Sequence, residues 1–290
     1  TLSVNGIPAG DFVNVVREDP EKPGLLYAGT EKHVYVSFDG GADWQSLQLN
    51  LPVTSMRDLD VHGDDLVLAT FGRAFWILDD ISALRQMDGS AGQSAATLFK
   101  PAVAYRVRPG GFLSTPLPKD EPQADDPHYG ALIDYYLKAD AAKPVTLEIV
   151  DAQGQSVRRF SSADVPPPLD LQTMPITPDW TPKVITLSNR AGMHRFVWNL
   201  HSALPDALAG NGKYRFTNGD GPWALPGQYT VKLTVDGQTY SQPLQIKADP
   251  RVRVSPEALQ QQFDLARRIE NQQMDIVRIY SQAAGLRSRL

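Results

Sequence analysis

Two aspartates and one arginine are the residues of this chain whose types and spacing suggest catalysis. Asp58 and Asp60 lie two positions apart in "MRDLDVHG", so an extended backbone points both carboxylates to one side. Hydrolysis of a glycosidic bond uses two carboxylates, one on each side of the scissile bond. Arg73 in "FGRAFW" could hold an anion or a carbohydrate. Ordinary hydrogen bonding at a turn or on the surface is the alternative reading for each of the three.

Other catalytic patterns are absent from the sequence. The five histidines have no metal-ligand spacing, and neither a G-x-S-x-G nucleophile turn nor a phosphate-binding loop occurs. The chain has no cysteine, which excludes disulfides, thiolate zinc sites and cysteine nucleophiles. We therefore expect no metal and no cofactor.

The stretch "SFDGGADW" has the spacing S-x-D-x-G-x-x-W, given by Ser37, Asp39, Gly41 and Trp44. The serine and aspartate side chains can accept hydrogen bonds from turn amides, and the glycines allow the positive φ of a tight turn. The tryptophan can pack on a neighbouring sheet as the next strand begins. We interpret the stretch as a structural turn, with direct ligand contact as the alternative.

The elements that must position these residues are short strands that repeat. "LLYAGTEKHVYVSFD" aligns with "LVLATFGRAFWILDD", and each segment follows another strand-like run. The repeat of about 40 to 45 residues is the length of one four-stranded propeller blade. We expect residues 1–95 to form about two such blades.

These motifs resemble the Asp-box, or BNR, repeats of bacterial propeller proteins, which are similar to sortilin, sialidases and xyloglucanase-like glycosidases. The resemblance extends from Phe12 to about Asp80. It implies a β-propeller of an exported, secreted or periplasmic protein and the label of a glycosyl hydrolase. No catalytic residue transfers with it, because the sialidase arginines and the glycosidase acids have no matching motif here.

The count of blades is too small for a complete propeller, which has at least four. The second set of strands contains three rather than four, so its last strand needs a partner. We expect the partner to be a missing upstream propeller segment or another protein chain.

A second β domain is expected over residues 96–250, with a long proline-rich and acidic loop near 109–128. A strand is also expected in "LFKPAVAYRVR", in the connector before this loop. Alternating strands such as "YTVKLTV" and an Asp-Gly hairpin indicate an immunoglobulin-like sandwich. Several of its strands resemble the Ig-like domain of flagellar hook-capping proteins. We expect Trp198 in the core and Trp223 exposed in a loop, where it could contact a ligand.

Residues 251–290 are expected to form a helix that begins with Ser255 as N-cap and Pro256 in the first turn. Its apolar stripe needs a partner surface, which could be another helix, the sandwich or a second copy of the chain. A helix lying on a membrane is the alternative. The stripe consists of Leu259, Phe263, Ala266, Ile269, Ile276, Ile279 and Ala283.

Charge and hydropathy exclude two classes of partner. The net charge of −5 argues against nucleic-acid binding, and no apolar run approaches the roughly 20 residues of a membrane span. The sequence favours a mainly β accessory portion of an exported glycosidase-like propeller protein. A glycoside hydrolase with further acids upstream and a sortilin-like propeller that binds peptides are the alternatives. A carbohydrate or a peptide is the expected ligand.

Overall fold

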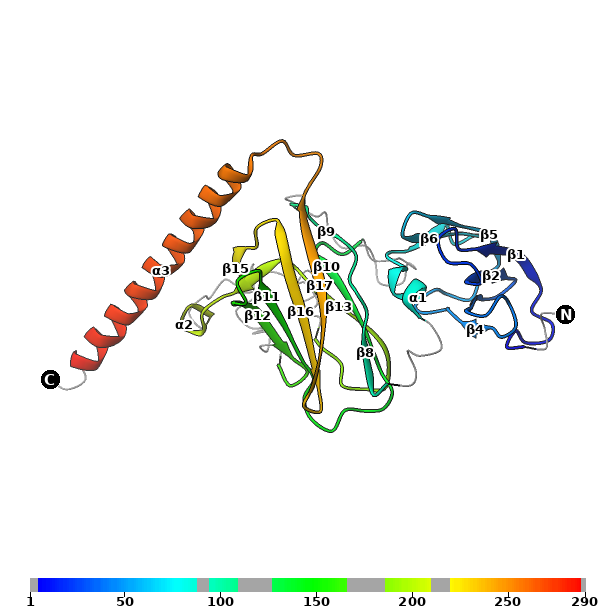
Figure 1. The fold of residues 1–290 in the computed structure, drawn as a ribbon, viewed down its shortest axis with the longest axis horizontal. Helices are drawn as coiled ribbons and strands as arrows, with labels where there is room; N and C mark the ends of the chain where they lie inside the picture. Colours follow the sequence, from blue (N-terminus) through cyan, green and yellow to red (C-terminus); the bar gives the residue numbers. More distant parts are fainter. Residues whose placement is uncertain (1–4, 88–93, 109–126, 166–185, 210–219, 288–290) are drawn as a thin grey trace. The chain divides into compact units, whose positions relative to one another are not determined.

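The computed structural model is mainly β with a C-terminal helix, and its contacts divide the chain into two units (Figure 1). The first unit comprises residues 1–94 and 117–127, and the second comprises residues 95–116 and 128–290. The structure describes residues 5–87, 94–108, 127–165, 186–209 and 220–287. Most of the expected long loop near 109–128 lies outside these residues.

Two antiparallel meanders make up the first unit. One sheet has four strands in the order β1-β2-β3-β4, and the other has three in the order β5-β6-β7. A short helix α1 follows the second sheet. The bounds are β1 Val13–Glu18, β2 Leu26–Thr30, β3 Val34–Ser37, β4 Gln45–Ser46, β5 Met56–His62, β6 Asp65–Thr70, β7 Phe75–Leu78 and α1 Ser82–Gln86.

The two meanders repeat as the alignment predicts. β3 begins at Val34 and β7 at Phe75, so equivalent strands are about 40 to 45 residues apart. Buried side chains recur at the same offset, with Leu25 matched by Leu66 and the ring of Tyr27 by Leu68. The repeat in the sequence is therefore a repeat of three-dimensional structure.

Both sheets of the first unit contribute to one apolar core, and Gly29 sits at their closest approach. A Cβ at this position would lie 2.8 Å from the Met56 Cβ and 2.9 Å from a Val15 methyl group. The absence of a side chain therefore lets β2 pack directly on β5. The buried members of the core are Val15, Leu25, Tyr27, Val34, Val36, Leu51, Met56, Leu59, Leu66, Leu68 and Ile81.

The second sheet ends at β7, as expected, without a fourth strand. Within the described part of the chain, β7 pairs with β6 alone. Two of its four side chains, Phe75 and Ile77, are exposed, at 75% and 54%. An unpaired edge with exposed apolar side chains is a surface on which another strand can add.

The second unit contains two larger sheets and a small hairpin (Figure 1). Three strands form one sheet in the order β13-β10-β8, and five form the other in the order β12-β11-β16-β17-β9. β14 and β15 pair separately, and α2 is one short turn between them. The bounds are β8 Ala96–Leu98, β9 Ala104–Arg106, β10 Ala131–Leu137, β11 Thr146–Asp151, β12 Ser156–Ser161, β13 Gly192–Trp198, β14 His201–Ala203, α2 Asp206–Ala209, β15 Asp220–Trp223, β16 Gly227–Val235 and β17 Gln238–Ala248.

The two larger sheets bury one common core. Trp198 of β13 is fully buried in it, as predicted, together with side chains of β10, β11, β16 and β17. The alternation predicted for "YTVKLTV" is confirmed, because Val231, Leu233 and Val235 are buried while the residues between them are half-buried. The core thus comes from the inward faces of two β layers.

The strand predicted in "LFKPAVAYRVR" is much shorter than the segment, because only β9, Ala104–Arg106, lies wholly within it. β8 ends at Leu98, the first residue of the segment, and the two strands belong to different sheets. β8 pairs antiparallel with β10, whereas β9 pairs parallel with β17. Pro101 lies between them, and a proline cannot donate a hydrogen bond to a strand ladder. The chain therefore crosses from one layer to the other at this point.

The C-terminal helix α3 spans Pro256–Arg287 and begins as predicted. The amide of Ala258 donates to the Ser255 hydroxyl over 3.2 Å, and Glu257 lies in the first turn. The predicted apolar stripe is only partly covered, because its later members are exposed. None of the described helices has both the length and the apolarity of a membrane span.

Candidate functional site

Asp58 and Asp60 both lie on β5, and both are exposed. A guanidinium nitrogen of Arg17, on β1, lies 2.8 Å from the Asp58 carboxylate. Each aspartate also accepts a hydrogen bond from the next backbone amide, Leu59 and Val61 respectively. The two acids thus lie two positions apart on β5. Arg17 of β1 is the cationic partner of Asp58.

Further polar side chains surround this ion pair. The Asn14 amide donates to the Glu31 carboxylate and to the Met56 carbonyl, over 3.0 Å each. The Arg57 guanidinium lies 3.6 Å from Glu31 and 5.0 Å from the centre of the Phe71 ring. The hydrogen bond from Asn14 is the main reason that the pKa of Glu31 lies below its ordinary value. We call Asn14, Arg17, Glu31, Arg57, Asp58 and Asp60 the β1/β5 polar face.

The chemistry of this face favours structural pairing over catalysis. A glycosidase acid is held protonated by an apolar pocket, and the second carboxylate lies across a cleft from it. Asp58 instead retains 62% of its side-chain surface and is paired with an arginine. Glu31 is stabilised as an anion. Neither Asp58 nor Glu31 is therefore suited to donate a proton to a leaving group.

Arg73 does not join the two aspartates. It lies in the turn between β6 and β7 and is exposed, and no described residue makes a hydrogen bond or an ion pair with its guanidinium. Its backbone carbonyl accepts a hydrogen bond from the Trp76 indole over 2.9 Å. The three catalytic candidates taken from the sequence are thus two residues of one strand and a separate turn residue.

The Asp-box turn has the hydrogen bonds that its residue types predict. The Ser37 hydroxyl donates to the Asp39 carboxylate over 2.8 Å and accepts from the Gly41 amide over 2.9 Å. Asp39 also accepts from the Asp43 amide over 2.9 Å, which is the main reason that the pKa of Asp39 is lowered. Gly41 has a φ of 91°. Trp44 is buried, and its indole donates to the Gly41 carbonyl.

An acid–imidazole pair that the sequence did not reveal lies near the β2–β3 turn. The His33 Nδ1 is 3.0 Å from the buried Asp11 carboxylate, and the Tyr35 hydroxyl donates to the same oxygen. Burial raises the pKa of Asp11, but the hydrogen bonds from His33, Thr30 and Tyr35 outweigh this and lower it overall. No local motif marks the pair, because its members come from a loop, a turn and a strand.

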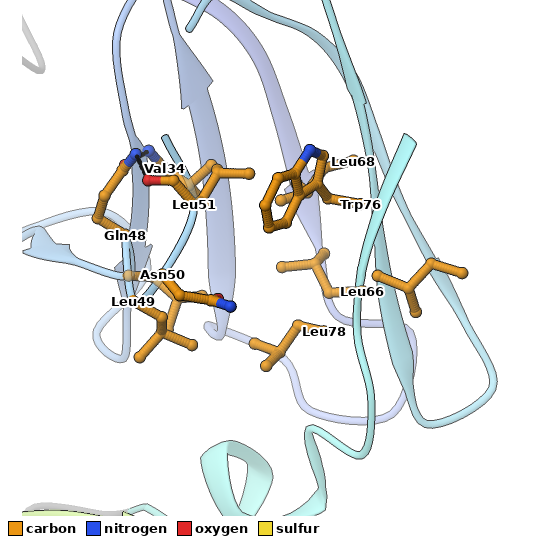
Figure 2. Close-up of a pocket in the computed structure, with 11 residues that line it drawn as sticks. Val34, Gln48, Leu49, Asn50, Leu51, Leu66, Leu68, Trp76 and Leu78 are labelled. Atoms are coloured by element: carbon orange, nitrogen blue, oxygen red, sulfur yellow. Dashed lines mark hydrogen bonds between the residues drawn. The ribbon is translucent and has the colours of Figure 1, made fainter. Parts of the chain in front are cut away.

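A small apolar hollow lies between the two sheets of the first unit, with a cavity volume of about 40 Å³ (Figure 2). Gln48 is hydrogen-bonded across its rim, to the Val34 amide and the Leu51 carbonyl. None of the lining residues is ionisable, so the hollow has no acid or base for catalysis. They are Val34, Leu47, Gln48, Leu49, Asn50, Leu51, Leu66, Leu68, Trp76, Ile77 and Leu78.

Trp223 is half-buried at the end of β15 rather than exposed in a loop. The His201 ring is stacked on it, with centroids 5.5 Å apart and planes 6° from parallel. The Arg106 guanidinium lies 4.6 Å from its ring centre. Because the indole already contacts these two side chains, it is not an open platform for a sugar ring.

Comparisons with known proteins identify no relative. No family model and no curated protein matches the chain. Two solved structures share limited likeness with it, both described as extracellular domains of BT4673 from B. thetaiotaomicron. The structure named as a one component system is 10% identical to this chain, with a TM-score of 0.20. The match covers 82% of this chain and 25% of that structure's chain. The structure named as a hybrid two component system is 12% identical, with a TM-score of 0.21. The match covers 85% of this chain and 27% of that structure's chain.

This chain therefore spans about a quarter of either extracellular domain. TM-scores near 0.2 carry no argument about fold or function.

Proposed function

We propose that this chain is the structural, accessory C-terminal portion of an exported β-propeller protein. In this proposal the two meanders of the first unit are propeller blades, and the two-layered second unit is an Ig-like sandwich. The Asp-box turn holds β3 and β4 together, because Ser37, Asp39 and Trp44 all form hydrogen bonds within the turn.

The open edge of β7 is the observation that carries the proposal. The first meander has four strands and the second has three, although the two repeat in sequence and in burial. A propeller blade has four strands, so the second meander lacks its outermost strand within the described residues. Phe75 and Ile77, beside the free edge, are exposed in this chain. This exposure is expected if another strand covers the edge in the full-length protein.

Hydrogen exchange of β7 tests the missing strand. We expect the segment Phe75–Leu78 to exchange at least about tenfold more slowly in the full-length protein than in this chain, because a fourth strand would bond its free amides. The measurement is peptide-level exchange followed by mass spectrometry. Segment Val34–Ser37 is the matched control, because β3 already has partners on both sides and should not change. Equal exchange of β7 in both proteins would contradict the proposal.

A glycoside hydrolase with one acid in this chain is the alternative, and Asp58→Ala and Asp60→Ala test it. We expect each variant of the full-length protein to keep the wild-type turnover of aryl-glycosides within about twofold. The reason is that both acids are exposed and that Asp58 is already paired with Arg17. Asp140→Ala, which removes an exposed acid of the second unit, is the control. A loss of a hundredfold or more in one β5 variant alone would assign that aspartate to catalysis.

A peptide-binding propeller remains the other candidate, and the open edge of β7 also favours it. An extended peptide can add to a free strand edge through its backbone, with alternate side chains entering apolar contacts. The exchange experiment separates the two cases. If a strand of the same protein covers β7, the β7 amides are protected from exchange without added peptide. If β7 is a peptide site, they are protected only after a peptide is added.

A further inference from the structure

Helix α3 has two apolar stripes on different sides. One stripe is half-buried and includes the apolar side chains of Phe263, Ala266, Met274 and Val277, with the buried Glu270 between them. The other is exposed. At 3.6 residues per turn the two stripes are separated by roughly 140° around the helix axis. The exposed stripe consists of Leu265, Ile269, Ile276, Ile279 and Leu286.

The half-buried stripe already has a partner within the second unit. α3 contacts β15 and α2, and the Arg106 guanidinium donates to the Gln262 side chain over 3.0 Å. The Gln262 contact lies before the exposed stripe begins at Leu265, and the members of that stripe remain exposed. Ile276 and Ile279 are 65% and 59% exposed.

The exposed stripe follows the heptad spacing of a coiled coil. When Gln272 and Ala283, which lie in the same row, are added to its five members, the intervals alternate between four and three residues, which places Ile269, Ile276 and Ala283 at a positions. Leu265, Gln272, Ile279 and Leu286 then occupy the d positions. Two of the three a positions are isoleucine and two of the four d positions are leucine, and isoleucine at a with leucine at d favours parallel two-stranded coiled coils. The pattern continues over more than three heptads.

We propose that this stripe of α3 pairs with the same stripe of a second copy of the chain, in a parallel, in-register coiled coil. The single polar core position supports a second copy as the occupant. Gln272 would face Gln272 of the other copy, and an amide side chain both donates and accepts, so two of them can hydrogen-bond to each other. A polar residue at one core position sets the register of a coiled coil.

The flanking charges agree with self-pairing. In a parallel pair each g residue faces the e residue five positions later in the other helix. Arg268 would therefore face Gln273, and Asp275 would face the hydroxyl-bearing Tyr280. No like charges meet in this register.

A membrane surface fits α3 less well than a second copy. Interfacial helices have a polar face rich in lysine and arginine, which is attracted to anionic lipid. The polar positions of α3 instead mix both signs, with Asp264 and Asp275 among Arg267, Arg268 and Arg278. Two ion pairs run along the helix, one between Arg278 and Asp275 and one between Arg267 and Glu270.

Molar mass in solution tests the proposal. We expect the 290-residue chain to reach twice its monomer mass in sedimentation equilibrium as its concentration rises to about 100 μM. Ile276→Glu places a charge in the seam and should keep the protein at the monomer mass over the same range. Asn271→Glu adds the same charge to the same helix at an exposed position outside the seam, and should leave the dimer intact. Circular dichroism is the control for folding, and we expect both variants to keep the helix signal of the unmodified chain.

Disulfide formation tests the register, because the chain has no cysteine of its own. Gln272→Cys should oxidise to a covalent dimer, since this position meets itself only in a parallel, in-register pair. Arg278→Cys lies outside the seam and should remain a monomer on a denaturing gel.

Four outcomes would overturn the proposal. A monomer mass at every concentration shows that α3 does not pair with itself. A dimer that survives Ile276→Glu uses another surface. A dimer that Ile276→Glu dissociates but that Gln272→Cys does not cross-link is antiparallel or out of register. Binding of the unmodified chain to vesicles of anionic lipid, lost in Ile276→Glu without any dimer, would assign the stripe to a membrane.

Discussion

Replacement of Trp198 by alanine should lower the free energy of unfolding of the second unit by about 3 to 5 kcal/mol, the usual result for a large aromatic core residue. The Trp198 side chain is fully buried. It packs edge-on against Tyr229, with ring centroids 5.9 Å apart, and its indole donates to the His201 carbonyl over 2.9 Å. The substitution therefore opens a cavity between the two sheets and removes the donor of a hydrogen bond.

The effect of the cavity and the effect of the lost hydrogen bond can be separated by a second substitution. Unfolding is followed in the second unit alone. Trp198→Phe keeps a ring but removes the indole donor, so we expect a smaller loss than for alanine. Met193→Ala on the same strand is the control, because that side chain is 39% exposed. Exchange of the β16 segment in urea reports on this unit, since β16 lies inside the five-stranded sheet. A loss below about 1 kcal/mol for Trp198→Ala would contradict the packing described here.

Removal of the Asp19 carboxylate should destabilise the first unit by about 3 to 5 kcal/mol, as expected when one member of a buried ion pair is lost. The Asp19 side chain is fully buried, and the Arg85 Nε lies 3.0 Å from each of its oxygens. It also accepts hydrogen bonds from the Glu21 and Lys22 amides. Asp19→Ala would thus leave a guanidinium and two amides without this acceptor.

The Asp19–Arg85 pair also joins the two repeats, because Asp19 follows β1 and Arg85 lies in α1 after β7. Burial alone would lower the pKa of Arg85, but the carboxylates of Asp19, Glu21 and Asp64 raise it on balance. Urea unfolding monitored through the β3 and β6 segments measures the loss. Asp58→Ala is the matched control in the same unit, since exposed ion pairs contribute about 0 to 1 kcal/mol. Equal losses in the two variants would show that burial of Asp19 does not matter.

Features that depend on a few neighbouring residues could be predicted from the sequence. The Asp-box turn follows from Ser37, Asp39 and the adjacent glycines, because the hydrogen bonds of the Ser37 and Asp39 side chains lie within seven positions. The start of α3 at Pro256 follows in the same way from Ser255 and Glu257. The repeat of strands in the first unit was visible because equivalent residues keep their spacing along the chain.

Contacts between distant positions could not be predicted. Asp58 was a catalytic candidate on the basis of its strand, yet its partner Arg17 lies 41 positions away. The Asp11–His33 pair and the Asp19–Arg85 pair have no signature in the sequence. An aspartate in the sequence does not reveal whether its carboxylate is exposed or buried. The segments that surround it in the fold decide whether it is a candidate catalytic acid or a structural anion.

The sequence by itself determined the β-rich character, the turns, the repeat and the helix, because these depend on local backbone preferences and on periodic apolar side chains. The tertiary structure decided that Trp223 contacts Arg106 and His201, and that the apolar side chains from Leu265 to Leu286 on one side of α3 stay exposed. It also divided "LFKPAVAYRVR" between two sheets. Burial is the physical reason for the difference, since the exposure of a side chain depends on segments that lie far from it in sequence.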